Sequence, residues 1–191
     1  YETPMTCRQI LTEHPKGKDF GWIIADLKKF PLLTDATGEV LSMAPVINSA
    51  TLGNVQVGDT GLMVELTGDN MENLMLAANI VACDFADAGY TILPCKVEHP
   101  YDTGFGKDIV APFYFQEPAT ASLSEINRLL GSQLTPEQVT TALEKMGNTV
   151  TVNGDKVTVQ IPPYRNDFLH EVDIIEDVMM GMELSSFPPE K

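Results

Sequence analysis

The sequence contains few of the residues that build metal and nucleophile sites. It has only three cysteines, Cys7, Cys83 and Cys95, an odd number with no pair at the spacing of a zinc site. They are typical of reduced thiols, so we expect a cytoplasmic protein. The three histidines are scattered along the chain, and nothing points to a Ser-His-Asp site. Zinc and nucleophilic chemistry are therefore not indicated.

Lysine and arginine are also scarce. The chain has 12 of them against 27 aspartates and glutamates, for a formal net charge of −15. This balance argues against a surface that grips a long stretch of phosphate backbone. The chain can still touch a short nucleic-acid end, and any broad grip has to come from another domain or subunit.

Long apolar runs are absent as well. No stretch approaches the roughly 20 apolar residues of a membrane span, and no basic, apolar signal segment begins the chain. The apolar fraction of 43% is nevertheless enough for a core, and 191 residues allow one or two domains. Because the sequence starts at Tyr1 without a methionine, we expect a piece of a longer protein.

The first half of the sequence predicts short elements around one long helix. Residues 1–43 are expected to be largely irregular, apart from a short helix over 20–27 and a hairpin with arms at 32–34 and 40–43. Alternating apolar residues predict a strand over 60–67, with Glu65 and Thr67 on one face.

The segments that follow predict a helix over 70–88 and a strand over 91–97. Gly, Asp and Pro are frequent from 100 to 112, and we interpret this stretch as a linker.

Beyond this stretch the pattern predicts a helix over 124–131 and a second helix that Thr135 caps. A hairpin over 149–161 and an acidic helix over 170–180 follow. The fold class is therefore α+β, with two mixed domains. The expected domains are 1–105 and 106–191, the second a small helix-helix-hairpin-helix domain.

This order of elements, ending in PPYRNDFLHEVDIIEDVMMGM (162–182), resembles the small domain of phenylalanyl-tRNA synthetase β subunits. The first domain resembles part of the editing domain of the same family, in its archaeal and eukaryotic form. The matching segments are HPKGKDF (14–20), LLTDATGEVLSMAPVINS (32–49) and LMVELTGDN (62–70). The chain departs from the family at Ala44, which replaces a proline, and at Met182, which often is a tyrosine. The N-terminal part of the editing domain is expected to lie outside this sequence.

The resemblance implies a ligase that joins phenylalanine to tRNA(Phe) with ATP. ATP would be bound by an α subunit in an α2β2 heterotetramer, and the 3′ end of tRNA(Phe) would be a further partner. The fragment alone is expected to be inactive. Two alternatives remain open, a free-standing aminoacyl-tRNA deacylase and a structural module without chemistry.

A group of carboxylates marks the C-terminal motif. On a helix, Asp173, Glu176 and Asp177 would share a face, and Asp167 lies shortly before them. Mg²⁺ takes carboxylate oxygens and water, and the resemblance implies a magnesium site at these four residues, shared with the α subunit. The alternative is a solvated acidic helix start, with Arg165 paired to Glu171 or Asp167.

The resemblance also implies an editing pocket at Leu33, Ser42, Glu65 and Thr67. Such a pocket hydrolyses Tyr-tRNA(Phe), with Glu65 accepting the tyrosyl hydroxyl, Leu33 as an apolar wall, and Ser42 and Thr67 as orienting groups. Archaeal relatives resemble the chain here but carry Asp in place of Glu65. The alternative is that Glu65 and Thr67 form the solvent face of an ordinary strand, with Leu33 in the core.

Overall fold

The computed structural model describes residues 3–187 and has the predicted α+β composition. The chain divides into two compact units, Tyr1–Thr67 and Gly68–Lys191, which are described separately. This division does not coincide with the predicted domain boundary at 105/106, which stays a prediction. No helix within residues 3–187 combines the length and the apolar character needed to cross a membrane.

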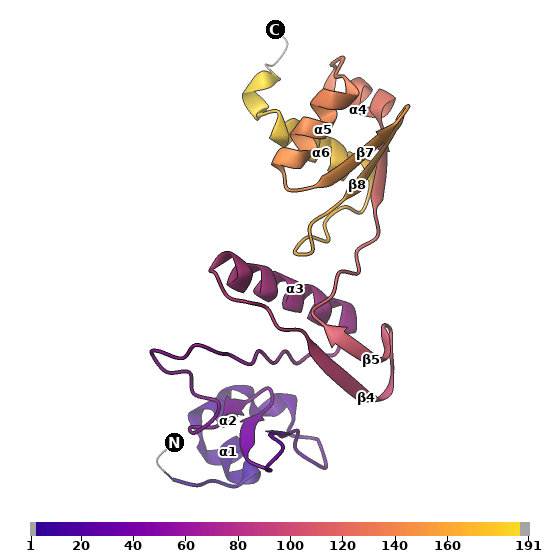
Figure 1. Ribbon diagram of the computed structural model, residues 1–191. Helices are drawn as coiled ribbons and strands as arrows, with labels where there is room; N and C mark the ends of the chain where they lie inside the picture. The colour runs from indigo at the N-terminus through magenta and orange to yellow at the C-terminus, as the bar shows by residue number, and fades with distance from the viewer. Residues whose placement is uncertain (1–2, 188–191) are drawn as a thin grey trace. The chain divides into compact units, whose positions relative to one another are not determined.

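The first unit begins with two short helices, α1 (Cys7–Glu13) and α2 (Pro15–Phe20), followed by the 3-10 helix η1 (Gly21–Ile23) (Figure 1). The prediction of an irregular start is therefore wrong, and the helix predicted over 20–27 is present only as the end of α2 and the short η1. Thr6 and Gln9 form a reciprocal capping box that starts α1. The side chain of His14 caps α2, whose first residue is a proline.

A three-stranded antiparallel sheet follows, with β2 (Val40–Met43) between β1 (Leu33–Thr34) and β3 (Ile47–Asn48). The predicted hairpin is thus confirmed, and Met43 of β2 lies in the small core of this unit. The strand predicted over 60–67 is wrong, because these residues form no strand. Their alternating pattern has no neighbouring strand to pair with in residues 3–187.

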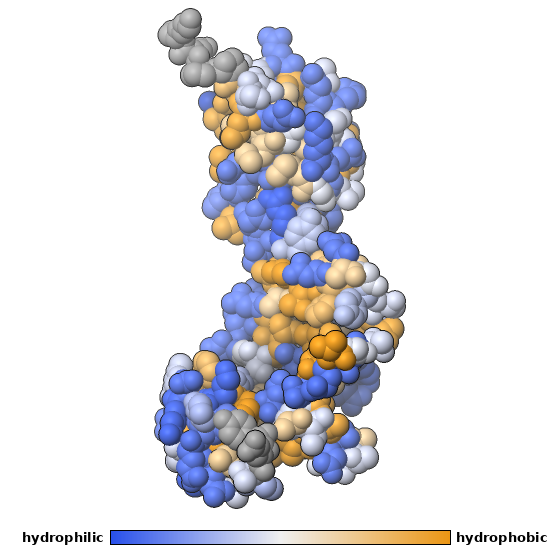
Figure 2. Space-filling view, turned by 90° about the vertical axis from the view of Figure 1, so that its left-hand side faces the viewer, coloured by the Kyte–Doolittle hydropathy of each residue, from blue (hydrophilic) through white to orange (hydrophobic). Residues whose placement is uncertain are grey.

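The second unit starts with the long helix α3 (Met71–Asp87), which confirms the helix predicted over 70–88, and the side chain of Asn70 caps it. The antiparallel hairpin of β4 (Cys95–Thr103) and β5 (Gly106–Ala111) comes next. The prediction of a linker over 100–112 is therefore wrong. Its glycines lie at the hairpin turn, Pro100 lies within β4, and Pro112 directly follows β5. In Figure 2 apolar surface gathers over this middle part of the chain, where Ile80, Leu93 and Val110 are exposed.

The rest of the second unit packs helices against a three-stranded sheet with strand order β6-β8-β7 (Figure 1). Its core is continuous and includes the fully buried Ile126, Leu143 and Ile174. The predicted helices and hairpin are confirmed here. The strands are β6 (Ala119–Ser122), β7 (Thr149–Asn153) and β8 (Lys156–Gln160), and the helices are α4 (Leu123–Leu130), α5 (Pro136–Lys145), α6 (Glu171–Gly181) and the 3-10 helix η2 (Leu184–Ser186).

Helices α5 and α6 approach each other at a position that admits only glycine. A Cβ atom placed on Gly181 would lie 2.0 Å from the carbonyl oxygen of Ala142. The obstacle is backbone, which cannot turn aside as a flexible side chain can. The close approach therefore fixes the spacing of the two helices that cover the core.

We expect Gly181→Ala to destabilise this part of the second unit by about 3 kcal/mol, the upper end of ordinary overpacking. The intrinsic gain of replacing a helical glycine, about 1 kcal/mol, is too small to offset the collision. Amide hydrogen exchange of α6 measures the effect, because the variant should expose α6 amides faster. The exposed neighbour Met180→Ala is the matched control. Equal protection in both variants would contradict the prediction.

Candidate functional site

The sheet of the first unit places three side chains, one from each strand, side by side on the same face. Ser42 of β2 pairs in register with Leu33 of β1 on one side and with Asn48 of β3 on the other. Directly opposed residues of antiparallel strands point to the same face. Leu33, Ser42 and Asn48 therefore lie side by side, although they come from three strands. Ser42 is buried at 4% exposure, and Leu33 is half-buried.

Glu65 joins this row from the extended segment that follows the sheet. One carboxylate oxygen accepts a hydrogen bond from the Ser42 hydroxyl at 2.9 Å, and the other accepts one from the Thr67 hydroxyl at 2.7 Å. Glu65 and Thr67 are themselves exposed. The four residues predicted for the editing pocket are thus brought together, and Asn48 is a neighbour of theirs. Their catalytic role stays a prediction.

This arrangement presents a fixed carboxylate next to an apolar side chain. A carboxylate has about four lone-pair positions, and two hydroxyls use only part of that capacity. Glu65 can therefore accept one more hydrogen bond from a ligand without losing the two that orient it. The Glu65 carboxylate is therefore suited to binding a hydroxyl group of a ligand.

The carboxylates of the C-terminal motif are arranged differently, because Arg165 lies among them. Its guanidinium donates to both oxygens of Asp167, at 2.9 and 2.6 Å, and to both oxygens of Asp177, at 2.6 and 3.0 Å. This ion pair lowers the pKa of Asp167, mainly through the hydrogen bond from Arg165, and raises that of Arg165. Of the two partners expected for Arg165, Asp167 is paired with it, whereas Glu171 accepts from Ser122.

Asp177 is the buried member of this group. Its side chain is 8% exposed, and it also accepts a hydrogen bond from Asn148 at 2.8 Å. A buried carboxylate requires this kind of compensation, since removing it from water is costly. These hydrogen bonds therefore connect three parts of the chain, namely the loop that carries Arg165, helix α6 with Asp177, and Asn148 just before β7. The sequence gives no sign of Asn148 as a partner, because the residues lie far apart in the chain.

The two other carboxylates face elsewhere. Asp173 accepts from the backbone amides of Leu169 and His170 at 2.7 and 2.6 Å and so caps α6. Glu176 is exposed. Across residues 3–187 no three aspartate, glutamate, histidine or cysteine side chains converge as metal ligands do. As arranged in this chain, the four residues do not fit a metal ion, and Arg165 supplies the neutralising charge. Magnesium binding stays a prediction.

Comparisons with known proteins bear on both regions. The family model of the tRNA synthetase B5 domain matches residues 119–183, which run from β6 to the end of α6. The β subunit of the phenylalanine–tRNA ligase from Treponema pallidum is 44% identical over 98% of this chain, and that from Borreliella burgdorferi is 49% identical over 95%. The chain belongs to the phenylalanine–tRNA ligase β-subunit family.

A solved structure of this family has the same fold. It is the crystal structure of an N-terminal fragment of the phenylalanyl-tRNA synthetase β subunit from Pyrococcus horikoshii, with a TM-score of 0.83 and 30% identity. The match covers 95% of this chain and 51% of that one. The chain spans about a third of the two curated β subunits named above, at 31% and 32% of their lengths.

The ion pairs of Arg165 with Asp167 and Asp177 should contribute much of the stability of residues 119–183, the part that matches the B5 domain. We expect Arg165→Ala to cost about 3 kcal/mol, because it leaves the buried Asp177 without its counter-charge. Arg128→Ala is a matched control, since it breaks an exposed pair with Glu125 and should reduce stability much less. Urea unfolding followed by far-UV circular dichroism compares the two. A smaller loss in Arg165→Ala than in Arg128→Ala would contradict the assignment.

The pair of Asp167 with Arg165 also predicts that the stability of the fold depends on pH in the acid range. Asp167 has a lowered pKa in the folded chain, so its contribution is complete above its unfolded pKa of about 4. It is lost as the pH falls through the lower folded value. The stability difference between the wild type and Asp167→Asn should therefore be constant from pH 5 upward and shrink below about pH 4. Chemical unfolding from pH 2 to 7 measures it, and a difference that did not change with pH would rule out this linkage.

Proposed function

We propose that the chain is part of a β subunit that works with an α subunit to attach phenylalanine to tRNA(Phe) with ATP. Its first unit hydrolyses tRNA(Phe) that carries tyrosine by mistake. ATP and the adenylation reaction belong to the α subunit, and the 3′ end of the tRNA reaches the first unit. The observation that carries the editing proposal is the hydrogen-bonded set of Ser42, Glu65 and Thr67 next to Leu33.

Editing answers a problem that binding alone cannot solve. Tyrosine differs from phenylalanine by one hydroxyl, and an apolar pocket rejects such an analogue by only about 100-fold. A second site that accepts the hydroxyl reverses the preference. Such a site binds the tyrosyl ester better, because phenylalanine has no hydroxyl to offer the acceptor.

Glu65 is suited to be that acceptor. The hydroxyls of Ser42 and Thr67 hold its two oxygens, so the carboxylate is oriented before the substrate arrives. A phenol hydroxyl then takes a remaining lone pair, while the ring packs against Leu33. A hydrogen bond to a charged acceptor contributes about 1.5–3 kcal/mol, which is enough to favour tyrosine over phenylalanine by at least tenfold.

The hydrolysis itself requires little chemistry from Ser42, Glu65 and Thr67. The ester between tyrosine and the tRNA is activated already, and the ribose carries a hydroxyl beside the ester oxygen. Positioning of the ester and of one water molecule is then the main contribution of the protein. Ser42 and Thr67 orient that substrate or water through the hydroxyl groups that flank Glu65.

Magnesium at the C-terminal motif belongs to the assembled enzyme in this proposal. Asp167 and Asp177 already share the guanidinium of Arg165, and of the four only Glu176 is exposed and accepts no hydrogen bond from residues 3–187. A metal ion there therefore needs further ligands from the α subunit.

The test offers Tyr-tRNA(Phe) to the complete two-subunit enzyme. We expect Glu65→Ala to slow release of tyrosine about 10- to 150-fold, the loss of one hydrogen bond to a charged acceptor. Glu39→Ala, which removes an exposed carboxylate of the same unit, is the matched control. Attachment of phenylalanine should be unchanged in both variants, which verifies folding and assembly. Undiminished deacylation in Glu65→Ala would refute the assignment.

A further inference from the structure

Basic residues are concentrated near the start of the first unit. Five of the 12 lysines and arginines of the chain lie between residues 8 and 29, although the whole sequence carries a net charge of −15. Two of them, Arg8 and Lys18, line an open cavity of about 350 Å³. Neither makes an ion pair with another residue in 3–187, so their charges are available to a ligand.

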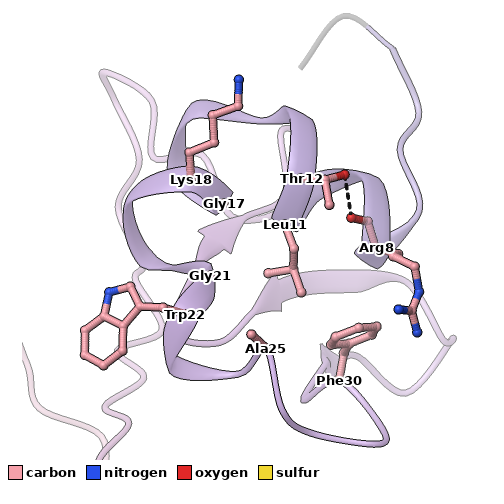
Figure 3. A pocket seen from close by; sticks show the side chains of 9 residues that line it. All are labelled: Arg8, Leu11, Thr12, Gly17, Lys18, Gly21, Trp22, Ala25 and Phe30. Atoms are coloured by element: carbon pink, nitrogen blue, oxygen red, sulfur yellow. Dashed lines mark hydrogen bonds between the residues drawn. The ribbon is translucent and has the colours of Figure 1, made fainter.

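The base of this cavity is rigid because α1 and α2 are in backbone contact. A Cβ atom on Gly17 would lie 1.8 Å from the carbonyl oxygen of Ile10, so no other residue fits there. Leu11 and Ala25 lie in the middle of the lining (Figure 3). This close crossing leaves a shallow apolar surface with no long side chain to fill it.

The edges of the cavity are aromatic and basic. Trp22 and Lys18 lie on one side of it and Phe30 and Arg8 on the other (Figure 3). Trp22 is 75% exposed, which is unusual for the residue with the largest apolar surface. The Arg8 guanidinium lies 5.9 Å from the centre of the Phe30 ring, so this side also offers a cation above an aromatic face.

An exposed aromatic ring beside lysine and arginine is the combination that binds unpaired nucleotides. Bases stack on aromatic rings with about 1–3 kcal/mol each, and cations contact the phosphates on either side. A double helix would not use the aromatic ring, because the bases of a duplex are already stacked.

We propose that this cavity binds single-stranded RNA, with one base stacked on Trp22 and the flanking phosphates against Lys18 and Arg8. The inference rests on the proposed function in one respect, since it takes the strand to be the 3′ end of a tRNA. The site anchors that end in the same unit that carries Glu65. It accounts for how a strongly acidic chain holds a nucleic-acid end, through a small cationic cavity and not a broad basic face.

Trp22 is the only tryptophan of the 191 residues, so its fluorescence reports on this cavity alone. We expect a short single-stranded RNA ending in CCA to quench the fluorescence of the chain in a saturable way, and an RNA duplex of equal length to quench it much less. Rising salt should weaken the binding, with a slope of about −0.7 for each phosphate contact. Absence of quenching at low salt would overturn the proposal.

Variants assign the contacts, with labelled RNA and fluorescence anisotropy as the readout. Trp22→Ala should raise the dissociation constant at least about fivefold and Trp22→Phe should restore part of the affinity, because a ring remains for stacking. Lys18→Ala should weaken binding and reduce the salt slope by about 0.7. The matched control is Lys28→Ala, an exposed lysine outside the cavity. Equal effects of Lys18→Ala and Lys28→Ala would show unspecific charge attraction and overturn the assignment.

Glu65→Ala separates this proposal from the editing proposal. It should leave the dissociation constant for the single-stranded RNA unchanged while it slows deacylation in the complete enzyme. If Trp22 is not quenched and deacylation still depends on Glu65, the RNA site is wrong and the editing function stands. If Trp22 is quenched and Glu65→Ala deacylates normally, the RNA site stands and the editing assignment is wrong.

Discussion

The paired charges of Arg165 and Asp177 organise the part of the chain that matches the B5 domain. Asp177 lies on the buried face of α6, where an unneutralised carboxylate would be very costly. Arg165 can reach it only if the loop between β8 and α6 folds back over the helix. That loop position in turn puts the guanidinium over the ring of Phe168, at 4.8 Å from its centre. This ion pair thus connects the loop to α6, and Asn148 is a second partner of the same carboxylate.

The C-terminal elements could be predicted because their signals are local. Thr135, Pro136 and Gln138 specify the start of α5 within four residues, and the structure has that capping box. The alternating valines of β7 and β8 point inward, as their pattern requires. Each of these signals agrees with the packing around it, so local preference and tertiary contacts give the same answer.

The predictions failed where a segment depends on a partner. Residues 60–67 alternate as a strand does, yet no strand lies beside them within residues 3–187. Residues 100–112 have the composition of a linker, but pairing between β4 and β5 overrides it. The helices at the start are different, because α1 and α2 have only 7 and 6 residues, too few for a clear helical period, although Thr6 and His14 cap them.

The sequence predicts the arrangement of the residues at the two candidate sites to different degrees. Leu33, Ser42, Glu65 and Thr67 come together as the resemblance implied, although alternation alone gives no sign that Ser42 and Thr67 donate to the exposed Glu65 carboxylate. For the C-terminal carboxylates, spacing predicted a shared face, and the structure assigns Asp173 to a helix cap and Asp177 to a buried ion pair. Spacing along a helix cannot reveal partners such as Arg165 and Asn148, which approach from other elements.

The unpaired segment 60–67 has one geometric consequence. Its backbone makes no hydrogen bond to other backbone groups within residues 3–187, so its donors and acceptors are free to join the edge of a sheet. Successive side chains of any such strand alternate between its two faces. Leu62, Val64 and Leu66 would then be presented to one side, whichever strand served as the template. Glu65 and Thr67 would stay neighbours on the other side, so strand addition would preserve the hydroxyl-bound carboxylate.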